Sequence, residues 1–349
     1  MKSFKIKNKN IGDNNRCFVI AEVAQAHDGS LGFAHSFIDL ASNSGVDAIK
    51  FQTHIASEES TYDEEFRVNF SYEDKTRFDY WERMEFSPNQ WKSLASYAES
   101  KGLIFLSSPF SVEAVKILDE INVPAWKIGS GELGNFDMLE HIASTKKPVL
   151  ISSGMSTFEE ISKTIDFLRE CQNDIQIGLF QCTTEYPTQP ENIGLNLINE
   201  LKLKFNCPVG LSDHSGDMIP PIAAMAIGAN MIEAHICFSK NQFGPDSSSS
   251  LTENEFKEVC RARDLIFTMN ENPVKKDDIA SELSATSKAF SRSAALSSPQ
   301  KKGTILTSDM IKFKKPGTGI NQENIKSILG KSFLNDVGVD RLLKPEDFQ

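Results

Sequence analysis

The sequence lacks any run of uncharged apolar residues long enough to cross a bilayer, so we expect no membrane partner. Its first ten residues, MKSFKIKNKN, carry lysines but no apolar segment behind them, which predicts a cytoplasmic protein without a secretory signal. The 349-residue chain has six cysteines, and none of them shows CxxC spacing. They therefore indicate reduced thiols, and they exclude a disulfide framework and a cysteine-based zinc site.

Basic residues are outnumbered, because 37 Lys and Arg stand against 48 Asp and Glu. The net charge of −11 argues against nucleic acid as a partner. The charge is also uneven, because residues 291–349 hold ten Lys and Arg against six Asp and Glu, a charge of +4. Residues 1–290 therefore carry −15. This split favours docking of the basic tail onto an acidic body, in the same chain or in a neighbouring one.

Strands and helices alternate along most of the chain. The first strand, FVIAE, is a short apolar run at 18–22, and AHSFIDLASNSG at 34–45 has helical apolar spacing with a glycine stop. Further strands are predicted over 47–52, 103–108, 125–132, 148–154, 175–182, 208–214 and 231–236, with helices between them and a final helix over 253–268. Eight strands with this alternation predict an α/β protein with a (β/α)8 TIM barrel. A doubly wound open sheet is the alternative, but AEVAQAHDG lacks the GxGxxG turn.

The predicted domains follow from breaks in this pattern. We assign residues 1–275 to the barrel, 276–290 to a polar linker, and 291–349 to a small, mostly β domain with Gly and Pro turns. Residues 53–86 are polar and aromatic without a clear period, and we expect an inserted loop with room for one helix.

Two histidines end neighbouring strands. VGLSDH ends at His214 and MIEAH ends at His235, with one helix between them, so the two strands should lie parallel and adjacent. Neutral imidazoles that converge there predict a divalent-metal site. The alternative is a pair of core histidines with ordinary hydrogen bonds. The carboxylates of Asp213, Glu233 and Asp246 near the same rim favour the metal site.

Other polar side chains gather at the predicted C-terminal ends of the strands, where barrel enzymes carry their active sites. Lys50 and Lys127 lie inside strands, where an unpaired ammonium is costly, so we favour a function over a solvated surface charge. Ammonium and serine hydroxyl groups suit a phosphate or carboxylate, and a metal beside a bound anion suits activation of a carbonyl. The rim therefore predicts a small phosphorylated acid and a second substrate with a carbonyl group.

The chain resembles the sialic acid synthases, also called N-acetylneuraminate synthases, over nearly all of its length. The resemblance is carried by IAEVAQAHDGS (20–30), GVDAIKFQTH (45–54), LSSPF (106–110), VPAWKIGSGEL (123–133), KPVLISSGMS (147–156), QCTTEYPTQPENI (181–193), VGLSDHS (209–215), IGANMIEAH (227–235), FGPDSSSSL (243–251) and KKPGTGI (314–320). It implies a barrel followed by an antifreeze-like (SAF) domain. It also implies a condensation of phosphoenolpyruvate with an N-acyl hexosamine of the N-acetylmannosamine type to a nine-carbon 2-keto acid and phosphate. The implied cofactor is a divalent metal, with Mn2+ first and Mg2+ or Co2+ as alternatives. The implied assembly is a domain-swapped homodimer in which the tail of one subunit caps the partner's active site.

The resemblance also implies a role for each matching position. His214 and His235 would ligate the metal, and Glu22 and Asp246 would be catalytic, near the water and the sugar carbonyl. Phosphoenolpyruvate would be held by Lys50, Ser108, Lys127, Ser130, Ser152 and Ser212. The sugar end would be lined by Gln52, Glu132 and Tyr186, and the N-acyl group approached by Phe290 and Lys315.

Several positions depart from the family pattern and concern the sugar. Lys315 stands where the family usually has Arg, which changes a planar fork into a point charge. Gln25-Ala26 replaces a common Asn-His pair, and Thr184 replaces a common Ser or Asn. Synthases of legionaminic or pseudaminic acid, which use a di-N-acyl hexose, are the alternative, and the GSGE motif ranks pseudaminic acid lower. A non-catalytic binding protein that uses its tail for interactions is a third interpretation, which the polar rim opposes.

Overall fold

The computed structural model describes residues 3–66 and 69–349. It divides into two compact units, residues 1–271 and 272–349, and each is described by itself. Within the described ranges, no helix has both the length and the apolar character needed to span a membrane.

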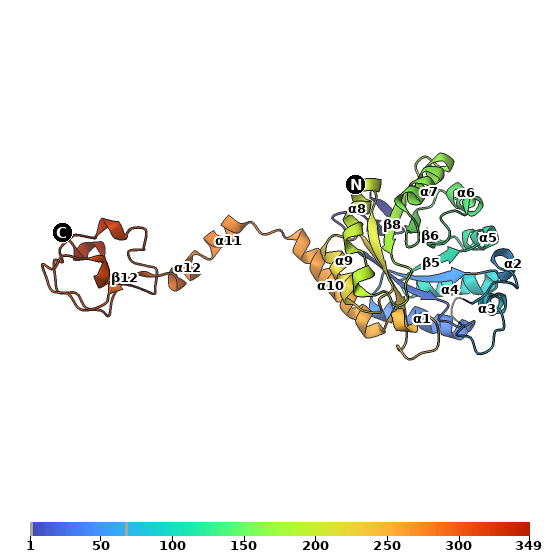
Figure 1. Ribbon diagram of the computed structural model, residues 1–349, viewed down its shortest axis with the longest axis horizontal. Helices are drawn as coiled ribbons and strands as arrows, with labels where there is room; N and C mark the ends of the chain where they lie inside the picture. The colour runs from blue at the N-terminus through green and yellow to red at the C-terminus, as the bar shows by residue number, and fades with distance from the viewer. Residues whose placement is uncertain (1–2, 67–68) are drawn as a thin grey trace. The chain divides into compact units, whose positions relative to one another are not determined.

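The first unit is a barrel of eight parallel strands (Figure 1). Neighbours pair in the order β5-β4-β3-β10-β9-β8-β7-β6, and β5 packs beside β6 to close the ring. The predicted (β/α)8 fold is therefore confirmed. The strands are β3 (Phe18–Ala24), β4 (Ala48–Thr53), β5 (Ile104–Pro109), β6 (Trp126–Ile128), β7 (Val149–Ser152), β8 (Ile177–Cys182), β9 (Val209–Asp213) and β10 (Met231–Ile236).

One long helix follows each strand and lies outside the ring (Figure 1). The helix ends carry ordinary capping signals: Ser30 accepts a hydrogen bond from the backbone of Phe33 at the start of the first helix, and Gly45 ends it at φ 77°. The helices are α1 (Leu31–Ser44), α4 (Pro88–Ser100), α5 (Val112–Glu120), α6 (Phe136–Ser144), α7 (Phe158–Cys171), α8 (Leu195–Phe205), α9 (Ile219–Ala226) and α10 (Glu253–Glu271). Short elements fill the last loops: η1 (Pro190–Asn192), η2 (Ser247–Ser249) and β11 (Ser250–Leu251).

The strands alternate between two faces, and this alternation positions the site. Outward residues such as Val19 and Ile49 pack against the helices. Inward residues are apolar where the strands begin, as at Ile20, and become polar where the strands end, as at Glu22. The polar rim thus lies on top of an apolar layer inside the barrel.

An N-terminal hairpin, which the sequence did not predict, fills the other end of the barrel. It consists of β1 (Phe4–Ile6) and β2 (Lys9–Ile11), and its apolar side chains join the inward apolar cluster. The backbone of Gly178 leaves the space for Phe4, since a Cβ there would lie 3.2 Å from the Phe4 ring and 2.9 Å from Met231. The hairpin therefore closes the barrel beneath the site.

The insertion at 53–86 differs from the expected loop with one helix, because its described residues, 53–66 and 69–86, form two helices, α2 (Ala56–Glu59) and α3 (Arg77–Met84). Thr76 and Asp79 form a reciprocal capping box at the start of α3. Residues 67 and 68 of this segment lie outside the described residues.

The second unit has its own small apolar core around Leu296, Phe333 and Leu343. Strands β12 (Ser293–Leu296) and β13 (Ile311–Lys314) pair antiparallel within it. The stretch 276–290, predicted as a linker, contains two helices that the sequence did not indicate, α11 (Lys276–Glu282) and α12 (Ser284–Phe290). Neither helix buries a residue, so no apolar periodicity indicated them. Single turns complete the unit: η3 (Ser308–Met310), η4 (Ile325–Ser327) and η5 (Pro345–Asp347).

Candidate active site

A cavity of about 930 Å³ opens at the C-terminal ends of the barrel strands. Its lower wall is the polar rim, and its upper wall includes Phe70, Arg77 and Trp81 from the insertion. The predicted residues that line it are Glu22, Lys50, Gln52, Ser108, Lys127, Ser130, Glu132, Ser152, Tyr186, Ser212, His214, His235 and Asp246. The structure therefore brings together every predicted site residue of the barrel.

Two buried ion pairs form the floor of the cavity. Lys50 Nζ lies 2.6 Å from Glu22 Oε2, and Lys127 Nζ lies 3.1 Å from Glu233 Oε1. Burial acts to raise the pKa of Glu233, but the ammonium groups of Lys127 and Lys50 outweigh it and hold that pKa below its usual range. For Glu22 burial outweighs Lys50, and its pKa is raised. Two positive and two negative groups thus share one desolvated floor, which keeps it near neutrality.

Serine hydroxyls surround the two ammonium groups. Lys50 donates to Ser108 Oγ at 3.3 Å, and Lys127 donates to Ser152 Oγ at 2.7 Å. The Ser212 hydroxyl donates to Glu233 Oε1 at 3.1 Å. Each of the three serines comes from the end of a different strand. Ser130 follows β6 and accepts a hydrogen bond from the backbone N–H of Gly154 at 3.1 Å. Ammonium and hydroxyl donors at this density suit an anion with several oxygens.

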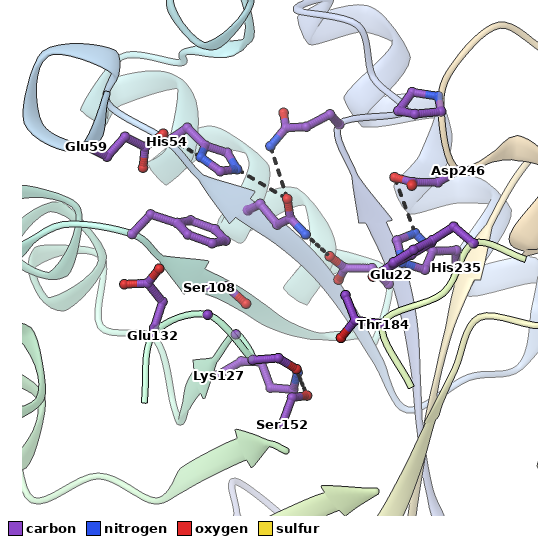
Figure 2. A pocket seen from close by; sticks show the side chains of 18 of the residues that line it. Glu22, His54, Glu59, Ser108, Lys127, Glu132, Ser152, Thr184, His235 and Asp246 are labelled. Carbon is purple, nitrogen blue, oxygen red and sulfur yellow. Dashed lines mark hydrogen bonds and ion pairs between the residues drawn. The ribbon is translucent and has the colours of Figure 1, made fainter. Parts of the chain in front are cut away.

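The two predicted metal ligands face each other across neighbouring strands, with ring centroids 5.3 Å apart. His214 Nδ1 lies 3.0 Å from the Thr183 carbonyl, and its Nε2 lies 3.2 Å from the Tyr186 hydroxyl. His235 Nδ1 lies 3.8 Å from Asp246 Oδ2 (Figure 2). Burial lowers the pKa of His214 to about 4 and that of His235 to about 3, so both rings are neutral at pH 7.

This donor set fits a divalent metal with two protein ligands. The Thr183 carbonyl requires the proton of His214 on Nδ1, which leaves Nε2 as the unprotonated nitrogen, beside the Tyr186 hydroxyl that a metal would displace. Among residues 3–66 and 69–349, no three His, Cys, Asp or Glu side chains are grouped as a metal site. The remaining ligands would therefore be water or substrate oxygens, and the metal stays a prediction.

The residues predicted for the sugar end lie on two sides of the cavity. Gln52 Nε2 donates to Glu22 Oε1 at 3.2 Å, next to the predicted acid–base group. Glu132 follows β6 in a turn, where burial raises its pKa and Asn135 donates to it at 3.0 Å. Tyr186 contacts His214, so it belongs to the histidine side.

Phe290 and Lys315 lie in the unit of residues 272–349. The ammonium of Lys315 lies 4.7 Å from the centre of the Phe290 ring, and Phe290 is 67% exposed. The structure therefore brings the two together with each other, and their predicted approach to the sugar stays a prediction.

Several residues of the cavity were not predicted as site residues. Glu233, which the sequence indicated only as a carboxylate near the histidine rim, completes the charged floor as the partner of Lys127. His54 lies two residues after Gln52 in the sequence. Glu59, Arg77 and Trp81 come from the insertion, whose aperiodic sequence gave no signal for them.

The model of the NeuB family matches residues 37–275. An uncharacterised protein of Methanocaldococcus jannaschii is 35% identical over 99% of both chains, and a pseudaminic acid synthase of Campylobacter jejuni is 33% identical over 97% of this chain and 99% of its own. The crystal structure of an N-acetylneuraminic acid (sialic acid) synthetase from Leptospira borgpetersenii superposes with a TM-score of 0.72 and 26% identity. That match covers 83% of this chain and 97% of the other. The chain therefore belongs to the NeuB family of sialic acid-type synthases.

Proposed function

We propose that this chain condenses phosphoenolpyruvate with the open form of an N-acyl hexosamine of the N-acetylmannosamine type. The products are a nine-carbon 2-keto sugar acid and phosphate. The observation that carries the proposal is the floor of the cavity, where Lys50 and Lys127 are buried among serine hydroxyls beside two neutral imidazoles. Such a floor suits an enol phosphate next to a site for carbonyl activation.

The lysines and serines of the floor bind the phosphate and carboxylate of phosphoenolpyruvate. Glu233 pairs with Lys127 and Lys50 and neutralises part of their positive charge. An anion must therefore form well-aligned hydrogen bonds with these lysines to compete with Glu233. His214 and His235 would hold a divalent cation, Mn2+ first and Mg2+ or Co2+ as alternatives. When bound there, such a cation polarises the aldehyde oxygen of the sugar.

Glu22 supplies the acid–base step. As C3 of phosphoenolpyruvate bonds to the aldehyde carbon, the carbonyl oxygen of the aldehyde becomes a hydroxyl group, and C2 becomes electron-poor and takes up water. One water proton passes to the Glu22 carboxylate and from there to the former aldehyde oxygen. The bond between C2 and the phosphate oxygen then breaks as the new C2 hydroxyl becomes the keto group, and the second water proton leaves with phosphate. Lys50 and Gln52 hold both carboxylate oxygens of Glu22 in place for this transfer. Asp246, next to His235, orients the sugar carbonyl end.

A di-N-acyl hexose is the alternative substrate, as in legionaminic or pseudaminic acid synthesis. The 33% identity to a pseudaminic acid synthase favours it.

One experiment tests both substrates. The protein, phosphoenolpyruvate and Mn2+ are incubated with mono- and di-N-acylated hexosamines, and the products are identified by mass. A product with only one sugar class assigns the substrate, and absence of sugar-dependent phosphate release contradicts the synthase.

The proposed assembly is a domain-swapped homodimer in which the tail of one subunit completes the partner's site. The family resemblance and the split between a +4 tail and a −15 body favour it.

A further inference from the structure

His54 lies between two aromatic rings at the edge of the cavity. Its imidazole is stacked on Trp81 of α3 and on Phe110, with centroid distances of 3.9 and 4.1 Å and interplanar angles of 14° and 13°. The side chain is 5% exposed. Because both faces of the ring are covered, its two nitrogens can only act within the ring plane. The stack therefore fixes the directions of both nitrogens.

Both nitrogens are used in a chain of hydrogen bonds that ends at Glu22 (Figure 2). His54 Nδ1 lies 2.6 Å from Glu59 Oε1, and Nε2 lies 3.2 Å from Gln52 Oε1. Gln52 Nε2 donates in turn to Glu22 Oε1 at 3.2 Å. Gln25 Nε2, at 3.4 Å, is a second donor to Gln52 Oε1. This series of hydrogen bonds thus links helix α2 of the insertion to the proposed acid–base carboxylate, Glu22.

The donor and acceptor roles along this series of hydrogen bonds determine where the protons of His54 and Glu59 lie. The Gln52 amide nitrogen faces Glu22, so its oxygen faces His54 and must accept a hydrogen bond. His54 therefore carries its proton on Nε2, and a neutral ring then has a bare Nδ1. Only a protonated Glu59 can donate to that nitrogen.

The surroundings of Glu59 agree with a protonated acid. Burial, reinforced by Glu64 and Glu85, raises the pKa of Glu59 to about 8, and burial lowers the pKa of His54 to about 3. Within the described residues, the second oxygen of Glu59 is buried without a hydrogen-bond partner. A buried carboxylate in that position would be costly, whereas a neutral carboxylic acid is not.

We propose that His54 and Glu59 are positioning residues for the reaction: a protonated Glu59 and a neutral His54 fix the amide of Gln52 so that it holds Glu22. Their effect on turnover rests on the proposed function, whereas the proton positions rest on the hydrogen-bond geometry and on the burial of both side chains. A side chain needed only to fill the slot between Trp81 and Phe110 requires no polar edge. The hydrogen bonds at both nitrogens therefore point to a role beyond packing.

Three variants separate the hydrogen bonds from the packing. His54→Phe keeps a ring in the stack and removes both hydrogen bonds, and Glu59→Leu removes only the donor to Nδ1. We expect each to lower kcat about 10- to 100-fold, with the KM for phosphoenolpyruvate unchanged. Glu59→Gln is the matched control, because its amide N–H donates to Nδ1 as the protonated acid does. It should stay within about threefold of the wild type, since one neutral hydrogen bond replaces another.

Two kinetic outcomes overturn the proposal. A His54→Phe enzyme with wild-type kcat shows that the hydrogen bonds position nothing. A Glu59→Gln enzyme as impaired as Glu59→Leu shows that Glu59 acts as a carboxylate. Thermal unfolding of each variant shows whether the barrel is intact.

Nuclear magnetic resonance of the full chain with 15N-labelled histidine tests the proton positions without turnover. The signal lost in His54→Phe belongs to His54. We expect a neutral ring protonated at Nε2 that does not titrate between about pH 5.5 and 8. A spectrum of a charged His54 ring, or of a neutral ring with its proton on Nδ1, overturns the proposal. This outcome counts whether or not the protein shows synthase activity. A wild type that releases no phosphate with any sugar contradicts the proposed function alone.

Discussion

Arg263 of α10 reaches under the barrel and pairs with Asp47 just before β4, with Nη1 2.9 Å from Oδ2 and both side chains buried. Asp47 also accepts a hydrogen bond from the backbone N–H of Val19 at 3.0 Å and pairs with Lys9 at 2.6 Å. One carboxylate thus joins the last barrel helix, two neighbouring strands and the N-terminal hairpin.

The substitution Arg263→Leu should destabilise the barrel by about 3 kcal/mol, because it leaves the Asp47 carboxylate buried with Lys9 as its only cation. Urea unfolding followed by tryptophan fluorescence measures this, since Trp81, Trp91 and Trp126 all lie in the barrel unit. The double variant Arg263→Leu/Asp47→Asn removes the stranded charge and should be less destabilised than Arg263→Leu. A double variant with the summed loss of both single variants contradicts this explanation.

The stability of the barrel should fall in mild acid because of His27. Its ring is fully buried against Phe86, and burial lowers its pKa to about 3 from the usual 6.5. Above pH 6.5 neither state binds the proton. Between pH 6.5 and 3 the unfolded chain is protonated first, so the free energy of unfolding falls as the pH falls.

At pH 5 this contribution amounts to about 2 kcal/mol relative to pH 7. His27→Phe should lose correspondingly less stability than the wild type between these two pH values in the same urea experiment. It also loses the hydrogen bond from Gly29, but that cost is the same at both pH values. Equal losses in wild type and variant would show that His27 is not the source.

Removal of either imidazole should abolish turnover without unfolding the barrel. His214→Ala and His235→Ala each take away one of two proposed metal ligands, and the second alone cannot hold the cation at the carbonyl. Phosphate release and bound metal per chain are measured with and without a chelator. Full activity in either variant, or a chelator-insensitive wild type, contradicts the ligand assignment.

Mixed dimers test whether the tail acts across subunits. Glu22→Gln chains and Phe290→Ala/Lys315→Ala chains should each form nearly inactive homodimers. In a domain-swapped heterodimer one site carries both defects and the other carries neither, so about half the wild-type activity per dimer should return. Differently tagged chains are co-expressed, purified over both tags and assayed. Tails that complete their own site leave every site defective, and no activity returns.

The sequence indicated the barrel well because eight apolar strands alternate with helices along the chain. Lys50, Lys127, His214 and His235 were predicted because polar side chains at strand ends interrupt apolar runs. The insertion was harder, since α3 packs aromatic side chains over a polar cavity and so lacks one apolar stripe. The link from Glu59 through His54 to Glu22 joins residues of α2, β3 and the end of β4, and only the folded chain brings them together.

The hairpin that contains Phe4, Ile6 and Ile11 restricts the routes by which substrate and product reach and leave the cavity. In the part of the chain that the structure describes, apolar side chains fill the barrel from the first strand residues up to the charged floor, which opposes the passage of polar molecules at that end. Substrate then enters through the cavity opening beside α2 and α3, and product leaves through the same opening. Slow release of product through this opening therefore delays binding of the next substrate, so product release can limit turnover.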